Sequence, residues 1–147
     1  MRQDSPGNEA KLPGVIAKTH GEAPPNWMVR IVPNKFPAFE PDAKADQEPP
    51  GPNRVVAGYG FHEVLIESPR HDSDLASMTD AEIDAVVCAY RERSRHLLRQ
   101  PGIAAVVLFR DHGPWGASLL HPRTQVVALG FVPPLLGLSA DWGKRYY

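Results

Sequence analysis

The segment H-P-R-T-Q holds the side chains best suited to chemistry in this chain of 147 residues. Alternate side chains of an extended strand share one face, so His121, Arg123 and Gln125 are predicted to project together. Pro122 and Thr124 would then face away. An imidazole, a guanidinium and an amide on one wall suit the oxygens of a phosphate ester.

The ten residues before this segment have features of a ligand-binding loop. Gly113 and Gly116 would let the backbone approach a ligand closely, and the hydroxyl of Ser118 with nearby backbone N–H groups could hold phosphate oxygens. A polar edge strand after an ordinary Gly-Pro turn explains the spacing equally well. The spacing alone therefore does not establish a binding site.

Short runs rich in β-branched and aromatic residues predict the strands that position this segment. Gly60 lies between two of these runs and predicts a tight hairpin. The expected strands are Trp27–Val32, Arg54–Tyr59, His62–Ile66, Ile103–Arg110 and Thr124–Val132.

A change of period predicts one long helix over residues 79–99. Thr79, with Glu82 three residues later, forms a capping box at its start, and Gln100-Pro101-Gly102 ends it. Residues 139–147 are compatible with a short second helix. The apolar residues expected to share one face of the long helix are Ile83, Val86, Val87, Tyr90, Leu97 and Leu98.

Proline and length limit the architecture. Ten of the 16 prolines precede residue 53, so the N-terminal third cannot be mostly helical. Residues 1–26 are predicted to be an irregular Pro/Gly-rich segment and residues 37–53 a loop. The length fits one domain over 1–147, and the element order predicts an α+β fold with a mostly antiparallel sheet and one long helix packed on it.

The charge balance limits the partners. Lys and Arg total 16 against 17 Asp and Glu, a net charge of −1, which provides no bulk field for nucleic acid or an anionic membrane. The single cysteine, Cys88, excludes an intramolecular disulfide. No apolar run is long enough for a signal-peptide core or a membrane span, so we expect a cytoplasmic protein.

Five longer segments resemble, in order and spacing, the galactose-1-phosphate uridylyltransferase family of the histidine-triad superfamily. This resemblance covers about the N-terminal half of a family member. It implies a histidine-triad-like domain, and uridylyl transfer between UDP-glucose and a hexose 1-phosphate through a nucleotidyl-histidine. The segments are SPGNE (5–9), VRIVPNKFPA (29–38), HEVLIESPRHDSDLASM (62–78), VVLFRDHGPWGASLLHPRTQVVA (106–128) and the terminal KRYY.

The resemblance assigns roles to several residues and shows that the nucleophilic histidine is replaced. The family's nucleophile is the second histidine of an H-P-H-x-Q motif, a position that Arg123 occupies here. A guanidinium stays protonated and cannot attack phosphorus, although it binds phosphate well. The resemblance also implies that Asn34, Ser118, His121 and Gln125 contact the nucleotide, the phosphate or the leaving group.

A second family motif also differs. The family's F-x-N-x-G motif has Asp111 in place of the asparagine, followed by Gly113. A carboxylate there replaces an amide donor and would repel a phosphate. The resemblance therefore implies a weakened nucleotide site.

The resemblance also implies a structural zinc, which many family members bind through a C-x-x-C pair and two histidines. The histidines are His71 and His121 here, but the cysteine positions hold Arg2 and Ser5. Two imidazoles do not satisfy the four-ligand preference of structural zinc. We therefore expect no zinc and no other cofactor.

Other candidates receive structural interpretations. His62 and His96 are predicted to be surface residues, and Cys88 a buried inert thiol. Four arginines between Arg91 and Arg99 are interpreted as a solvated helix face rather than a nucleic-acid site.

Three hypotheses for function follow. The first is an enzyme, either a nucleotidyltransferase of the uridylyltransferase type or a related adenylyl-transferring phosphorylase, in which another residue such as His112 or His121 replaces the missing nucleophile. The second is a non-catalytic module that binds a nucleotide sugar or sugar phosphate, and the third is a truncated half-domain. Arg123 favours the last two. A missing C-terminal domain or a second copy of the chain would be its macromolecular partner, and we expect neither nucleic acid nor membrane as a partner.

Overall fold

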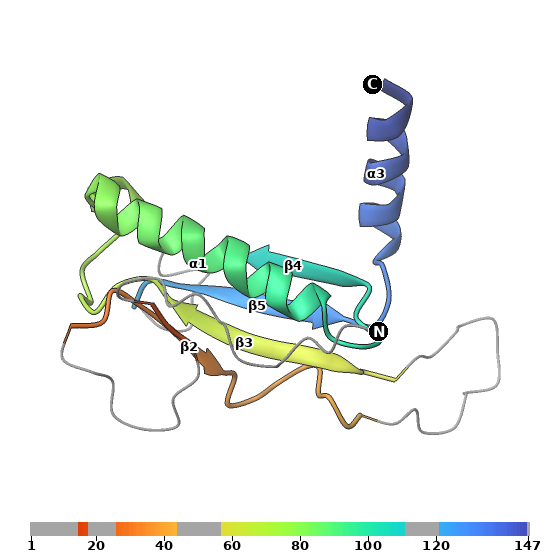
Figure 1. The fold of residues 1–147 in the computed structure, drawn as a ribbon, viewed down its shortest axis with the longest axis horizontal. Helices are drawn as coiled ribbons and strands as arrows, with labels where there is room; N and C mark the ends of the chain where they lie inside the picture. The colour runs from red at the N-terminus through yellow and green to blue at the C-terminus, as the bar shows by residue number, and fades with distance from the viewer. Residues whose placement is uncertain (1–14, 18–25, 44–56, 111–120, 147) are drawn as a thin grey trace, which may run out of the picture.

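The computed structural model describes residues 15–17, 26–43, 57–110 and 121–146. Within these ranges, five strands form one sheet in the order β1-β2-β3-β5-β4 (Figure 1). β1 pairs with β2 in parallel, and the other neighbouring pairs are antiparallel. The strands are β1 (Val15–Ala17), β2 (Val29–Pro33), β3 (Gly60–Ile66), β4 (Ala105–Phe109) and β5 (Arg123–Leu129).

One long helix, α1 (Asp80–Leu98), lies across one face of this sheet (Figure 1). The predicted capping box is confirmed: the Thr79 side chain accepts from the backbone N–H of Glu82, and the Glu82 carboxylate accepts from that of Thr79. A short 3-10 helix, η1 (Leu75–Ser77), precedes α1 and has its own capping box. The prediction of an α+β fold with a mostly antiparallel sheet is confirmed.

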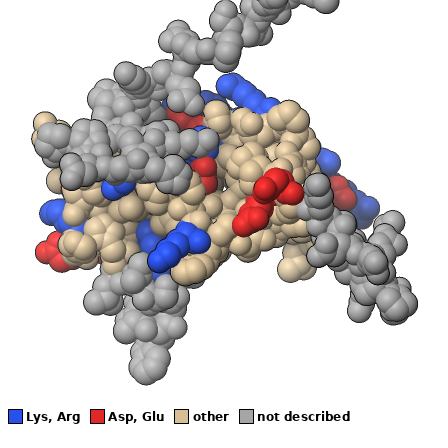
Figure 2. All heavy atoms as spheres, turned by 90° about the horizontal axis from the view of Figure 1, so that it is seen from below, with Lys and Arg blue, Asp and Glu red and all other residues tan. Residues whose placement is uncertain are grey.

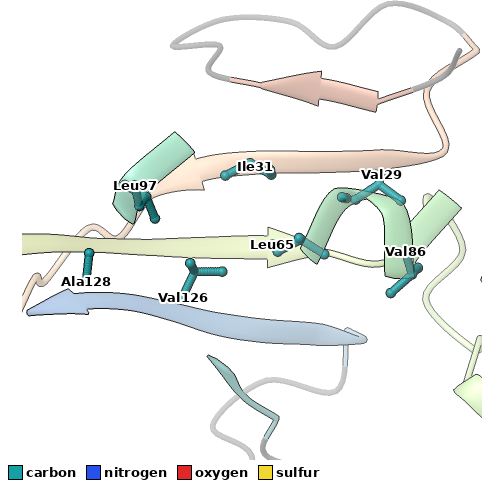
Figure 3. Close-up of a cluster of buried hydrophobic side chains, with 8 residues drawn as sticks. Val29, Ile31, Leu65, Val86, Leu97, Val126 and Ala128 are labelled. Atoms are coloured by element: carbon teal, nitrogen blue, oxygen red, sulfur yellow. The ribbon is translucent and has the colours of Figure 1, made fainter. Parts of the chain in front are cut away.

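The core lies between α1 and the sheet. Side chains from β2, β3 and β5 point toward apolar residues of the helix, and Leu65 and Val126 are completely buried (Figure 3). The cluster consists of Val29, Ile31, Leu65, Val86, Ala89, Leu97, Val126 and Ala128. At about 1.5–3 kcal/mol for each large side chain, this burial is the main force that holds α1 on the sheet.

The predicted buried face of α1 is partly wrong. Val87 and Leu98 are 54% and 49% exposed, whereas Arg93, predicted to be solvated, is only 5% exposed. Val86, Ala89, Arg93 and Leu97 follow helical spacing, so they form the stripe that meets the sheet. Arg93 lies within this stripe because β3 supplies a carboxylate for it.

The predicted hairpin at Gly60 is also wrong. Gly60 is the first residue of β3 and lies opposite Leu129 of β5. Tyr59 forms an isolated parallel bridge to Glu40 and belongs to no strand, and residues 54–56 lie outside the described ranges. Gly60 is required for close approach rather than for a turn, since a Cβ there would overlap with the backbone oxygen of Ala128.

Two described segments near the ends of the chain are more regular than expected. β1 lies within the segment predicted to be irregular, and it forms because Val15–Ala17 pair with the exposed edge of β2. The C-terminal helix α3 (Pro134–Tyr146) begins five residues earlier than predicted and projects away from the sheet (Figure 1). Among the described residues, no helix combines the length and apolar character needed to cross a membrane.

Candidate functional site

The alternation predicted for residues 123–125 is confirmed. Thr124 is 2% exposed and faces α1, whereas Arg123 and Gln125 are half-buried on the other side of β5. His62 of β3 alternates with Glu63, which also faces α1. We call the side of the sheet that carries His62, Arg123 and Gln125 the site face.

Three side chains, one just after β2 and one each from β3 and β5, meet on the site face. The Nδ2 atom of Asn34, which follows β2, donates to Oε1 of Gln125 at 3.2 Å. Nε2 of His62 lies 3.0 Å from the same Oε1 atom and 3.1 Å from Nδ2 of Asn34. Asn34 and Gln125, which were predicted from sequence, are thus brought together by β2, β3 and β5.

His62 is the residue of this group that the sequence interpretation missed. Its Nδ1 atom accepts from the backbone N–H of Ala38 at 3.1 Å, and its Nε2 atom lies against Gln125, so it is not a simple surface residue. The alternation of side chains along β3 could have identified His62 from the sequence. Because Leu65 belongs to the core, His62 must lie on the face opposite it.

His121 belongs to a different cluster. Its Nε2 atom lies 2.8 Å from the carbonyl oxygen of Ser68, and its Nδ1 atom lies 2.9 Å from Nδ1 of His71. The guanidinium of Arg123 donates to the backbone oxygen of His121 at 3.4 Å. The predicted single wall of His121, Arg123 and Gln125 is therefore divided, with the His121 ring bound to the segment after β3.

The His71–His121 pair is the part of the implied zinc site that the described residues contain. Two imidazole nitrogens do not complete a tetrahedral set, and the family's cysteine positions hold Arg2 and Ser5, outside the described ranges. In the described ranges, no group of three or more histidine, cysteine, aspartate and glutamate side chains is arranged to bind a metal. The described residues thus supply two of the four ligands that a structural zinc needs, and its absence stays a prediction.

The helix side of the sheet carries ion pairs that the sequence analysis did not identify. Arg93 binds Glu63 in bidentate fashion, with both N–O distances 2.6 Å and both side chains 5% exposed. Glu63 and Glu67 share a face with Leu65, so the strand period could have identified them as buried acids that need partners.

Glu67 is the centre of a second buried network. It accepts from Thr124 at 2.6 Å, from Tyr90 at 2.9 Å and from Nε of Arg110 at 2.9 and 3.1 Å. Arg110 also donates to Asp74 at 3.0 Å. This network fixes Arg110, which immediately precedes residues 111–120.

The buried network shifts two pKa values. Burial is the main cause of the raised pKa of the Tyr90 phenol, and the adjacent charge of Glu67 acts in the same direction. Burial lowers the pKa of Arg110, but the hydrogen bond and charge of Glu67, with those of Asp74, outweigh it and leave that pKa above its ordinary value. Both groups therefore keep their protons at neutral pH.

Three predicted ligand-binding residues, Asp111, Gly113 and Ser118, lie in residues 111–120, outside the described ranges. The residues on either side of this segment are described. Arg110 is held by Glu67 and Asp74, and His121 is held by Ser68 and His71.

Comparison with known proteins shows the family to which this chain is related. The family model described as galactose-1-phosphate uridyl transferase, N-terminal domain, matches residues 12–133. The ADP-glucose phosphorylase of Arabidopsis thaliana is 32% identical over 126 residues, which cover 84% of this chain and 36% of that protein. The galactose-1-phosphate uridylyltransferase of Rattus norvegicus is 34% identical over 125 residues, which cover 80% of this chain and 31% of that protein.

Solved structures of related proteins have the same fold as this chain. A crystal structure of the Arabidopsis thaliana ADP-glucose phosphorylase with bound ADP-glucose matches with a TM-score of 0.70 and 30% identity, over 84% of this chain and 38% of that one. A uridylyltransferase structure matches 99% of this chain and 47% of that one, with a TM-score of 0.78 and 24% identity, and so shows the shared fold. The chain spans about a third of the length of these curated relatives and less than half of the solved chains.

Proposed function

Because this chain belongs to the galactose-1-phosphate uridyl transferase family, we propose that it binds a nucleotide sugar or sugar phosphate on the site face without forming a covalent nucleotidyl intermediate. The observation that carries this proposal is the place of Arg123 on β5. It lies on the same side of the strand as Gln125, at the position that the family resemblance gives to the nucleophilic histidine.

The chemistry of Arg123 supports binding rather than transfer. A nucleophile needs a lone pair, and a guanidinium keeps its protons at every physiological pH. The same group donates in a planar fork that matches two oxygens of a phosphate. With the amide of Gln125 two residues away, the strand offers hydrogen-bond donors to an anion.

His121 is an unsuitable replacement nucleophile. Its Nε2 atom faces the carbonyl oxygen of Ser68 and its Nδ1 atom faces His71, so each ring nitrogen already has a hydrogen-bond partner. An attacking imidazole needs one unprotonated nitrogen directed at phosphorus. This supports the non-catalytic form of the proposal over an active site relocated to His121, whereas His112 lies outside the described ranges.

The relatives guide the choice of ligand. One is named for ADP-glucose and several for galactose 1-phosphate, so UDP-glucose, ADP-glucose and a hexose 1-phosphate are the probes to compare.

We further propose a histidine-triad-like domain, in line with the superfamily to which the resemblance points. The net charge is −1, and Figure 2 shows mostly uncharged residues on the described surface viewed from below. Any anion must therefore be held by local donors.

Thermal unfolding with and without these probes tests the binding. A ligand near 100 times its dissociation constant should stabilise the wild-type chain by about 2.7 kcal/mol. Arg123→Ala should abolish most of this gain, whereas Arg91→Ala, at an exposed position on α1, should retain it. If none of the three probes stabilises the wild type, the binding function is wrong.

Intact-mass measurement after incubation with UDP-glucose or ADP-glucose tests the absence of transfer. The wild type should show no added uridylyl or adenylyl mass. An acid-labile adduct of either mass would show that another residue acts as the nucleophile and would overturn this part of the proposal.

A further inference from the structure

Asn34 has a fixed amide orientation. Its Oδ1 atom accepts from the backbone N–H of Phe36 at 2.9 Å, so the Nδ2 atom must lie on the other side of the amide. This Nδ2 atom donates to Oε1 of Gln125. The turn after β2 thus presents a donor, not an acceptor, to Gln125.

The tautomer of His62 is fixed in the same way. The backbone N–H of Ala38 donates to Nδ1, so that nitrogen carries a lone pair and the ring proton is on Nε2. A proton on Nδ1 would oppose the N–H of Ala38. The proton on Nε2 and the Nδ2 donor of Asn34, whose nitrogens lie 3.1 Å apart, instead share Oε1 of Gln125 as their acceptor. The Nε2–H group therefore donates to Oε1 of Gln125, at a distance of 3.0 Å.

Gln125 consequently receives two hydrogen bonds on one oxygen. The donors from Asn34 and His62 occupy both lone pairs of Oε1, so the amide cannot rotate without replacing an acceptor by a donor. Among the residues that the structure describes, no hydrogen bond of Gln125 ends on its Nε2 atom. The two N–H groups of this atom remain on the site face, which also carries Arg123.

We propose that His62 is a positioning residue for the ligand site. The Nε2–H group of His62 holds the side-chain amide of Gln125 in one orientation. In this orientation the amide nitrogen of Gln125, and not its oxygen, faces a bound phosphate or sugar hydroxyl. The anchor for this tautomer is the backbone of Ala38, so His62 also joins the segment after β2 to β3 and β5. The proposed benefit to binding rests on the proposed function, whereas the tautomer and the amide orientation do not.

Two variants of His62 separate its two hydrogen bonds. Asparagine ends near the position of Nδ1, so His62→Asn can accept from Ala38 but cannot donate to Gln125. Glutamine reaches the position of Nε2, so His62→Gln can donate to Gln125. Gln125→Glu is the control at the other end, because it keeps an acceptor for both donors and removes the N–H groups.

Affinity for UDP-glucose and ADP-glucose, measured by calorimetry, is the first test. His62→Asn and Gln125→Glu should each weaken binding by about tenfold or more, the effect of losing a hydrogen bond to a charged group. His62→Gln should bind within about threefold of the wild type, a difference of less than about 0.7 kcal/mol. Equal affinity of His62→Asn and the wild type would overturn the positioning role.

Imidazole nitrogen NMR of the ligand-free protein is the second test, and it does not depend on any ligand. His62 should give the pattern of an Nε2–H tautomer, and the side-chain amide resonances of Gln125 should move in His62→Asn but much less in His62→Gln. An Nδ1–H pattern, or unchanged amide resonances in His62→Asn, would overturn the inference. A wild type that binds no probe but gives the expected spectra would refute the proposed function alone.

Discussion

The two faces of the sheet use polar groups in opposite ways. On the helix side, Glu63 and Glu67 are 4% and 1% exposed, and each is paired with an arginine within the chain. On the site face, Asn34 and His62 both contact Oε1 of Gln125, and we propose that this directs the N–H donors of Gln125 toward a ligand. Buried charges that are satisfied within the chain are not available to a ligand, whereas donors left accessible can bind one.

The largest expected effect on stability comes from breaking the buried Glu63–Arg93 ion pair. Arg93→Met should lower the free energy of unfolding by about 3–5 kcal/mol, because Glu63 would remain charged and unpaired in the core. Arg91→Met, at a side chain that is 55% exposed, should change it by less than about 0.5 kcal/mol. Urea unfolding followed by circular dichroism measures both values.

The double variant Glu63→Leu/Arg93→Met shows whether the loss comes from the unpaired charge. It should recover most of the stability that Arg93→Met loses, since an apolar pair needs no compensation. A double variant as unstable as the single one would indicate lost packing of the arginine stem instead.

Variants of two neighbouring residues of β5 distinguish effects on the stability of the fold from effects on ligand binding. Thr124→Val removes the hydroxyl that donates to Glu67, and Gln125→Ala removes the acceptor of Asn34 and His62. Each should lower the free energy of unfolding by about 1–2 kcal/mol. Only Gln125→Ala should also abolish the stabilisation by nucleotide sugar. An equal loss of ligand response in Thr124→Val would mean that the two faces are not independent.

The smallest expected effect is the alkaline titration of Tyr90. Burial raises the pKa of its phenol above the ordinary value near 10, so the folded state keeps the proton that the unfolded state releases. Its contribution to stability is complete below about pH 10 and is lost as the pH rises above that value. Absorbance at alkaline pH should show a tyrosine that titrates late in the wild type and is absent in Tyr90→Phe. A wild-type titration without this late component would contradict the buried network.

Local sequence determined the elements. The capping box at Thr79, the helical period over residues 79–99 and the β-branched runs at β2, β4 and β5 depend on neighbouring residues, and the structure confirms them within a few positions. The same holds for the opposite orientation of Thr124 and Gln125, because alternation is a property of a single strand.

Tertiary structure decided the partners. Gly60 looked like a turn residue because close approach to Ala128 depends on which strand lies beside β3. Arg93 looked solvated because Glu63 is 30 residues away in sequence, and burial of a charge depends on a partner that only the sheet and helix bring together. His62 looked like a surface residue for the same reason, since Asn34, Ala38 and Gln125 converge on it only when β2, β3 and β5 pair.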